Sequence, residues 1–266
     1  GFPVVNVHPL YPARELTHQL NDSGARALVV IENFAHVVEE ARPNLKLDAI
    51  IVATAGDLMG FKGTIVNFVA RKIKKVVKPY NLPGAVPLKS IFAAPSQMSP
   101  VAIAPEDVAF LQYTGGTTGM PKGVMWRHED LWRATGSGSN PRLGLGPSPD
   151  LESFLERLQA ISPPVNLPLP PMMHGTGLLS CVRAMTYGGT AVTLTGRSFD
   201  APEALAAIQE HKVTALTIVG DAFARPMLDA LNANTGKFDI SSVQVISSSG
   251  VMWTREVKAG LLRHNE

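Results

Sequence analysis

The most informative part of the sequence is Tyr113-Thr114-Gly115-Gly116-Thr117-Thr118-Gly119-Met120-Pro121-Lys122-Gly123-Val124. An apolar run over 108–111 precedes it, and a second apolar run over 124–126 follows. This pattern predicts a strand, a glycine-rich loop and a second strand. Glycines let the backbone approach a ligand closely, and threonine hydroxyls, backbone N–H groups and a lysine ammonium all bind phosphate. We therefore predict a phosphate-binding loop; the alternative is a flexible hairpin tip without a ligand.

The loop differs from a Walker A loop. That motif ends in Gly-Lys-Ser/Thr at the start of a helix. Here Pro121 precedes Lys122, Gly123 follows it, and no helix-forming run comes next. The predicted phosphate-binding loop therefore connects two strands instead of leading into a helix.

Composition favours a globular protein that does not bind nucleic acid. Of 266 residues, 45% are apolar and 17% are charged, and the net charge of +2 gives no global attraction to a polyanion. The single cysteine, Cys181, excludes an internal disulfide and suits a reducing compartment, and its apolar surroundings predict a core residue. The sequence shows neither a signal peptide nor an apolar run long enough to span a bilayer, so we expect a cytoplasmic protein.

Strands alternate with helices along the chain, which predicts an α/β fold with doubly wound βαβ sheets. In the first part of the sequence, the pattern predicts strands over 2–7, 27–31 and 49–53 and helices over 13–23 and 33–41. The strand over 27–31 is expected to be buried on both faces. The last part predicts strands over 190–195, 214–219 and 243–247, and helices from 201 to 211 and from 222 to 231. Asp200 and Glu203 fit a capping box. Residues 79–105 and 136–149 are predicted loops, and 151–161 a short helix.

Two turns are candidate ligand sites by position, because ligands in such sheets bind at the carboxyl ends of strands. They are Val219-Gly220-Asp221 and Ser247-Ser248-Ser249-Gly250-Val251. A separate candidate is His174, which follows an apolar strand ending in prolines and precedes Gly175-Thr176-Gly177. The alternatives are ordinary strand-to-helix turns and a structural histidine. His128, next to the opening stretch, is interpreted as a surface or capping residue.

Residues 62–78 are the one local charge anomaly, because six lysines and arginines occur there without an acid. Ile65, Val69, Ile73 and Val76 fall at helical spacing, which predicts a basic amphipathic helix. Such a helix can lie on an anionic membrane surface, which would make the protein peripheral at the inner face of the membrane. We favour the alternative, in which the apolar face packs on the domain and the lysines lie in water.

Residues 113–124 resemble the phosphate-loop signature of the adenylate-forming enzymes, which include acyl-CoA synthetases, luciferases and peptide-synthetase adenylation domains. The family pattern is Tyr-Thr-Ser-Gly-Thr-Thr-Gly-x-Pro-Lys-Gly, and this chain carries Gly115 at the position of the serine. Residues 6–11 and 18–24 resemble the scaffold of long-chain fatty acid–CoA ligases.

The resemblance implies an ATP-dependent acyl-CoA ligase for long-chain or bulky hydrophobic carboxylic acids. Its small-molecule partners would be the acid, ATP and CoA, with Mg²⁺ as cofactor. Both ends of the chain fall inside predicted elements, so we expect 1–266 to be a partial N-terminal AMP-binding domain without the small C-terminal domain. The alternatives are an adenylating enzyme that loads a carrier protein and an inactive nucleotide-binding fragment.

The resemblance also implies roles for single residues. Lys122 and His174 would be catalytic, with His174 orienting the reacting carboxylate or gating its access. Val219, Gly220 and Asp221 would line the acyl pocket together with His174, and Thr118 would also contact the metal. The nucleotide would bind to Thr114, Gly115, Gly116, Thr117, Thr118, Gly119, Lys122, Ser248, Ser249 and Gly250. The serines at 247–249 depart from the Gly-Gly or Gly-Ala that is usual beside adenine.

Overall fold

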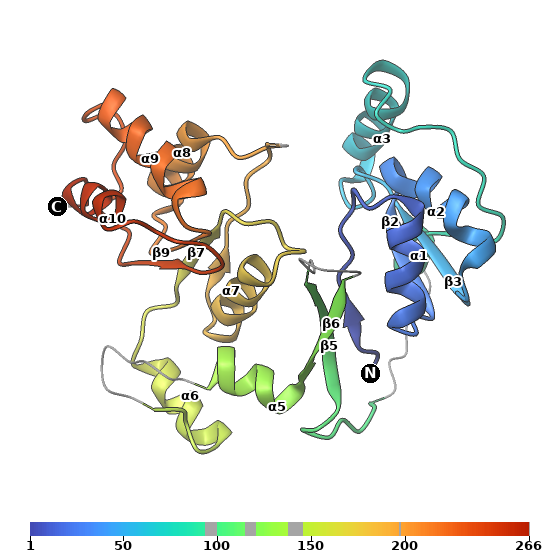
Figure 1. The fold of residues 1–266 in the computed structure, drawn as a ribbon, viewed down its shortest axis with the longest axis horizontal. Helices are drawn as coiled ribbons and strands as arrows, with labels where there is room; N and C mark the ends of the chain where they lie inside the picture. Colours follow the sequence, from blue (N-terminus) through green and yellow to red (C-terminus); the bar gives the residue numbers. More distant parts are fainter. Residues whose placement is uncertain (94–99, 115–120, 138–145, 197, 266) are drawn as a thin grey trace. The chain divides into compact units, whose positions relative to one another are not determined.

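The computed structural model describes residues 1–93, 100–114, 121–137, 146–196 and 198–265. The chain forms two compact units, residues 1–128 and 129–266. The elements of unit 1 are labelled in Figure 1. Its helices are α1 (Ala13–Asp22), α2 (Ala35–Ala41), α3 (Gly60–Phe68) and α4 (Leu88–Ala93), with short helical turns at Glu32–Phe34, Arg42–Asn44 and Val69–Ile73. Its strands are β1 (Val4–Val5), β2 (Ala27–Ile31), β3 (Ala49–Ala53), β4 (Val86–Pro87), β5 (Val108–Thr114) and β6 (Lys122–Arg127).

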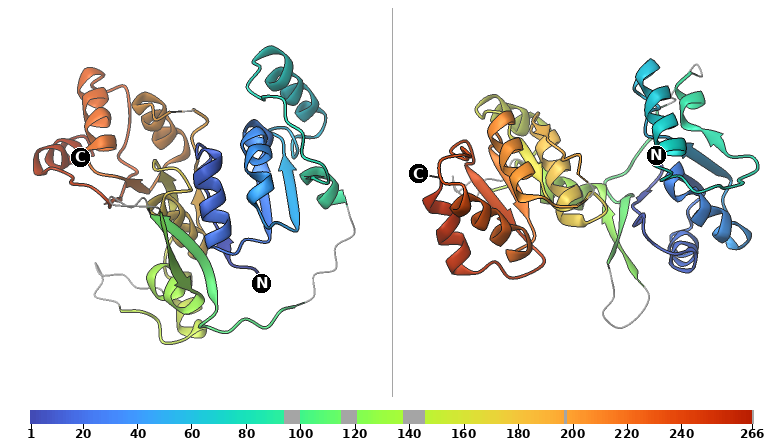
Figure 2. Two further views of the ribbon diagram at one scale, coloured as in Figure 1. Left: turned by 45° about the vertical axis from the view of Figure 1, so that its right-hand side comes forward. Right: turned by 90° about the horizontal axis from the view of Figure 1, so that it is seen from above.

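Unit 1 contains two three-stranded sheets. The first is parallel, with the order β2-β3-β4, and its apolar side chains pack against α1 and α2. Leu16 and Leu20 of α1 lie in this core with Leu28 and Ile50 of the strands. The second sheet has the order β1-β5-β6, in which β5 and β6 form an antiparallel hairpin. Figure 2 shows this hairpin in green.

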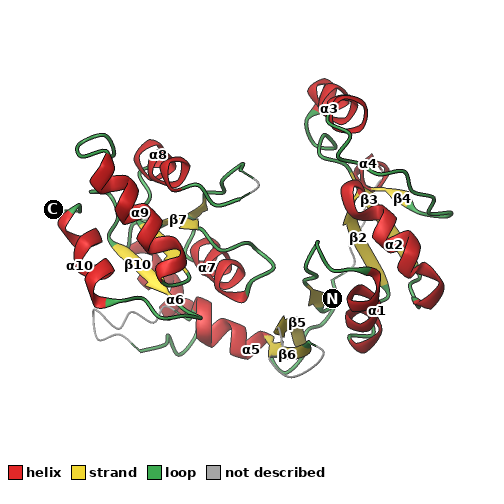
Figure 3. Ribbon diagram, turned by 45° about the horizontal axis from the view of Figure 1, so that its top comes forward, coloured by secondary structure: helices red, strands yellow, loops and turns green. Residues whose placement is uncertain are grey.

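Unit 2 is built around a four-stranded parallel sheet of order β10-β9-β7-β8. The strands are β7 (Val165–Pro168), β8 (Thr190–Ala191), β9 (Ala215–Ile218) and β10 (Val245–Ser248). The helices are α5 (His128–Leu131), continued by a turn at Trp132–Gly136, α6 (Leu151–Gln159), α7 (Gly175–Thr186), α8 (Ala201–His211), α9 (Asp221–Ala233) and α10 (Arg255–Arg263). Helices α8, α9 and α10 share one core, whereas α7 packs on β7, β8 and β9 (Figure 3).

This strand order confirms the predicted doubly wound arrangement. The chain leaves β7 for β8 on one side, and then passes back to β9 and β10 on the other side. The direction therefore reverses between β7 and β9, which is where open α/β sheets form a crevice at the carboxyl ends of their strands. Two buried polar side chains join this centre, because the Thr217 hydroxyl donates to Asn166 Oδ1 at 3.2 Å and Asn166 Nδ2 donates to Ser180 Oγ.

Several sequence expectations need correction. Strand β2 alternates between buried and exposed side chains instead of being buried throughout, because the core covers only one of its faces. The predicted loop over 79–105 contains β4 and α4. The strand expected over 190–195 ends at Ala191, because β8 is an edge strand that pairs with β7 alone. Cys181 is buried, as expected.

The expected capping box is half formed. Asp200 Oδ1 accepts a hydrogen bond from the Glu203 backbone N–H at 2.8 Å and caps α8. The Glu203 carboxylate turns the other way and accepts hydrogen bonds from Thr195 and from the Gly196 N–H, so it holds the preceding loop instead. None of the helices in the described ranges is both long and apolar enough to cross a bilayer.

Candidate functional site

The hairpin of unit 1 brings together the two ends of the glycine-rich stretch. Thr114 is the last residue of β5 and Lys122 the first of β6, and they face each other across the ladder. Both side chains are exposed. The predicted strand, loop and strand are therefore confirmed for both strands. Residues 115–120, which hold the predicted phosphate ligands Gly115, Gly116, Thr117, Thr118 and Gly119, lie outside the described residues.

Helix α1 contacts both ends of the hairpin. The Tyr113 hydroxyl donates a hydrogen bond to Asp22 Oδ2 at 2.6 Å, and a ring nitrogen of His18 lies 3.2 Å from the Pro121 carbonyl oxygen. Burial, and then the hydrogen bond to Asp22, raise the pKa of Tyr113 well above its ordinary value. His18 and Asp22 lie four residues apart on one face of α1, so one helix face orients both strands. Sequence reasoning assigned this region to the scaffold and missed its contacts with the loop ends.

In unit 2, His174 is the N-cap of α7. Its ring Nδ1 accepts a hydrogen bond from the Thr176 backbone N–H at 3.2 Å. The neutral ring therefore carries its hydrogen on Nε2, since a neutral imidazole has one donor and one acceptor nitrogen. The side chain is exposed. Because Nδ1 is used in capping α7, Nε2 is the ring nitrogen that can contact a ligand.

Gly177 allows α7 to start this close to the end of β7. A Cβ at this position would lie 2.5 Å from the carbonyl oxygen of Pro170 and 2.6 Å from that of Pro171. Any other residue would overlap this backbone, so Gly177 serves close packing. The consequence is that His174 is held at the carboxyl end of β7.

The turns after β9 and β10 are linked to each other and to α7. The Gly220 N–H donates to Ser248 Oγ at 2.9 Å, and the hydroxyl oxygens of Thr176 and Ser249 lie 2.5 Å apart. Gly220 has φ 55°, which side-chain-bearing residues rarely adopt, and a Cβ there would collide with the Met252 carbonyl oxygen. Three strand ends are thereby joined into one cluster, which we call the strand-end cluster (His174–Gly177, Val219–Asp221 and Ser247–Val251).

Asp221 takes a structural part in this cluster. Its Oδ1 accepts a hydrogen bond from the Thr254 backbone N–H at 3.0 Å, and Oδ2 lies 3.6 Å from Arg225. The hydrogen bond from Thr254, assisted by Arg225, lowers the pKa of the Asp221 carboxyl. The carboxylate thus holds the segment between β10 and α10 against α9. Thr176 and Thr254 were not predicted from sequence, because nothing local indicates which distant turn a threonine meets.

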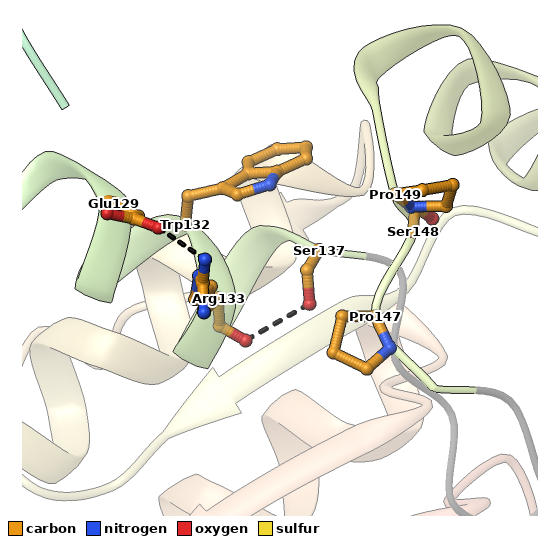
Figure 4. A pocket seen from close by; sticks show the side chains of 7 residues that line it. All are labelled: Glu129, Trp132, Arg133, Ser137, Pro147, Ser148 and Pro149. Carbon is orange, nitrogen blue, oxygen red and sulfur yellow. Dashed lines mark hydrogen bonds and ion pairs between the residues drawn. The ribbon is translucent and has the colours of Figure 1, made fainter.

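A separate pocket lies in unit 2, between the α5 helix and the segment 146–149. Its lining residues are shown in Figure 4: Glu129, Trp132, Arg133, Ser137, Pro147, Ser148 and Pro149. The two charged side chains in it are paired with each other, and Ser137 Oγ donates to the Arg133 carbonyl oxygen. None of the site residues predicted from sequence lines this pocket. His128, expected at the surface, is exposed.

Comparison with known proteins identifies the family. The model of a family described as "AMP-binding enzyme" matches residues 1–265. The chain belongs to this AMP-binding enzyme family. A long-chain-fatty-acid–CoA ligase of Escherichia coli O6:H1 is 36% identical over 263 residues, covering 97% of this chain and 44% of that protein. A 3-oxocholest-4-en-26-oate–CoA ligase of Rhodococcus rhodochrous is 32% identical over 260 residues, covering 96% and 43%.

Solved structures of AMP-binding enzymes share the fold. An anthranilate CoA ligase in complex with anthranoyl-AMP superposes with a TM-score of 0.68 at 20% identity, covering 98% of this chain and 43% of that one. A long-chain-fatty-acid-CoA ligase from Archaeoglobus fulgidus gives a TM-score of 0.65 at 21% identity, covering 97% and 43%. This chain thus spans less than half of the length of these relatives.

Proposed function

We propose that this AMP-binding enzyme is the nucleotide- and acid-binding part of an ATP-dependent acyl-CoA ligase that acts on long-chain or bulky hydrophobic carboxylic acids. Family membership and the relatives of 32% to 36% identity support the reaction class. The observation that carries the proposal is the pairing of Thr114 with Lys122 at the ends of the hairpin, because it sets a hydroxyl and an ammonium beside the glycine-rich residues.

The proposed reaction has two steps. The carboxylate of the acid attacks the α-phosphate of ATP, which forms acyl-adenylate and releases pyrophosphate. The thiolate of CoA, formed by loss of the thiol proton to water, then attacks the acyl carbon, and the bond to AMP breaks so that AMP leaves. Neither step requires a side-chain nucleophile. The chain's own groups would act by neutralising phosphoryl charge and by orienting the acid, which is the usual means of catalysis in phosphoryl transfer.

The proposed roles divide between the hairpin of unit 1 and the strand-end cluster of unit 2. Lys122, Thr114 and residues 115–119 would hold the β- and γ-phosphates. Ser248, Ser249 and Gly250 would contact adenine, and Val219, Gly220 and Asp221 would line the acid site. His174 would orient the carboxylate through Nε2, because Nδ1 caps α7.

Mg²⁺, when bound, would neutralise phosphate charge. In the described part of the chain no three His, Cys, Asp or Glu side chains are placed to hold a metal, and Thr118 lies outside that part, so its role as a metal contact stays a prediction. The proposal includes a cytoplasmic location, where ATP and CoA are supplied, and a peripheral membrane contact through residues 62–78, because long-chain acids partition into lipid.

Calorimetry on this chain tests the proposal. ATP and a non-hydrolysable long-chain acyl-adenylate analogue are both expected to bind. Lys122→Ala should weaken ATP by about tenfold or more, since it removes a charge-assisted contact. It should leave the analogue unaffected, because the analogue lacks β- and γ-phosphates. Lys89→Ala, an exposed lysine in the same unit, is the control.

The outcomes separate the candidate functions. Equal ATP affinity in Lys122→Ala and Lys89→Ala would refute the phosphate role of Lys122. Binding of ATP without binding of the acyl-adenylate analogue would favour an inactive nucleotide-binding fragment, and absence of binding by either ligand would refute the proposal. Binding without preference for a long acyl group over an aminoacyl group would instead favour an enzyme that loads a carrier protein.

A further inference from the structure

The helix formed by α3 and the turn Val69–Ile73 is attached to unit 1 through glycine and polar contacts. The backbones of Gly63 and Gly56 touch so closely that a Cβ on either would overlap the other. Asn67 Oδ1 accepts from the Gly56 N–H at 2.9 Å, and Asn67 Nδ2 donates to Thr54 Oγ1 at 2.8 Å. One turn later, Arg71 pairs with the Glu32 carboxylate at 2.7 Å. Spacings of four residues place these contacts on one helix face.

The opposite face is apolar and uncovered. Phe61, Ile65 and Phe68 follow one another at spacings of four and three residues, and they are 82%, 54% and 57% exposed. Surface helices normally turn their apolar side chains towards the core. Here that arrangement is reversed. The expectation that the apolar face of 62–78 packs on the domain is therefore wrong for Ile65 and Ile73, which are both exposed. In Figures 1 and 3, α3 stands at the periphery of unit 1.

Basic side chains surround this apolar face. No Asp or Glu occurs between Asp57 and Glu106, whereas seven lysines and arginines do. The lysines nearest to the helix are all exposed: Lys62, Lys72, Lys74, Lys75 and Lys78. An aromatic and aliphatic face flanked by lysines is the composition of helices that lie in the plane of a membrane interface.

We infer that residues 60–78 form a docking surface for an anionic phospholipid bilayer. Phe61, Ile65 and Phe68 enter the boundary between headgroups and acyl chains, and the flanking lysines meet the headgroup phosphates. Charge complementarity selects this partner, because lysine is depleted in protein–protein interfaces but attracts anionic lipid. The ion pair of Arg71 with the buried Glu32 carboxylate and the Asn67 contacts hold the helix in place, so its apolar face is presented before binding. This inference rests on the peripheral membrane contact of the proposed function and names its residues and its lipid partner. The docking requires neither ATP nor an acid, so its failure would leave the proposed ligase reaction untouched.

Vesicle co-sedimentation tests the inference. The chain is expected to bind vesicles of phosphatidylcholine mixed with phosphatidylglycerol, and to bind vesicles of phosphatidylcholine alone much more weakly. Added salt should weaken binding, because it screens the lysines. Equal binding to both vesicles, or binding to neither, would overturn the inference.

Matched lysine variants locate the contact. Lys62→Gln with Lys72→Gln should weaken binding to the mixed vesicles about thirtyfold, since each lysine near an anionic surface contributes about a fivefold factor. Lys46→Gln with Lys89→Gln makes the same charge change at exposed positions of unit 1 outside the segment and should have no measurable effect. An equal loss in both pairs would show a general charge effect and no docking surface.

Apolar variants test the insertion. Phe61→Ser with Phe68→Ser should reduce binding about a hundredfold, whereas Phe2→Ser with Phe92→Ser, also exposed, should not. All four side chains are exposed, so the melting temperature should stay at the wild-type value. Gel filtration without vesicles excludes another occupant: a dimer that Phe61→Ser with Phe68→Ser dissociates would mean that a second copy of the chain covers this face.

Discussion

The Tyr113 hydroxyl donates a hydrogen bond to the Asp22 carboxylate at 2.6 Å, joining residues 91 positions apart. Tyr113 is the residue before Thr114, where the hairpin reaches its glycine-rich end. The bond therefore ties the hairpin to α1, and through α1 to the core of unit 1. The contact with α1 thus fixes the position of the strand end from which the glycine-rich stretch begins.

Tyr113→Phe is expected to destabilise unit 1 by about 1 kcal/mol, the net value of a hydrogen bond at a partly exposed site. Urea unfolding of Tyr113→Phe, Asp22→Ala and the double variant measures it. The two single changes should not add, because each removes the same bond. Additive losses would mean that the bond contributes nothing.

The same bond predicts a pH dependence. The hydrogen bond needs the protonated phenol, and the pKa of Tyr113 is raised in the folded state. The stabilisation is therefore complete below the ordinary tyrosine pKa of about 10 and is lost as pH rises towards the folded pKa. The unfolding free energy of wild type should fall more steeply above pH 10 than that of Tyr113→Phe. Parallel curves for the two proteins would contradict the assigned cause.

Gly177→Ala should destabilise unit 2 by about 2 kcal/mol, because the added methyl meets two backbone carbonyl oxygens after β7 and the helix must shift. Differential scanning calorimetry measures the change. Gly146→Ala is the control, since a Cβ there enters open space. If both variants melted at the same temperature, close packing at Gly177 would not constrain α7.

Arg71→Met should cost about 3 kcal/mol, because it leaves the Glu32 carboxylate buried without its partner. Glu32 is 1% exposed, whereas both partners of the Arg26–Asp48 pair lie in water. Arg26→Met should therefore cost less than about 1 kcal/mol in the same denaturant titration. Adding Glu32→Leu to Arg71→Met should recover part of the loss. A double variant no more stable than Arg71→Met would argue against a stranded charge.

Asp221→Asn should flatten the acid dependence of unit 2. The pKa of Asp221 is lowered in the folded state, so its stabilisation is present above the ordinary aspartate pKa and is lost as pH falls through the folded pKa. The melting temperature of wild type should thus drop more steeply in acid than that of Asp221→Asn. Asp229→Asn, an exposed carboxylate on the same helix, is the control and should follow wild type.

Local patterns predicted most elements because they depend on neighbouring residues. The hairpin strands around 113–124, helix α1 and the strand–helix alternation after Thr190 are all present. The errors have tertiary causes. Strand β2 is apolar throughout, yet only one of its faces meets the core. Ile65 and Phe68 are exposed because contacts of Gly63 and Asn67 hold the other face of the helix.

The family could be predicted from the run between Tyr113 and Val124, because that motif is specific. The alternation of strands and helices could be predicted because periodicity is local. Which distant residues meet is seen in the folded structure alone. It paired Asp22 with Tyr113, joined Gly220 to Ser248, and used Nδ1 of His174 as a cap. It also turned Phe61 and Phe68 to the surface. Such contacts depend on how elements pack, and a glycine or a polar residue far along the chain can set the packing without any local signal.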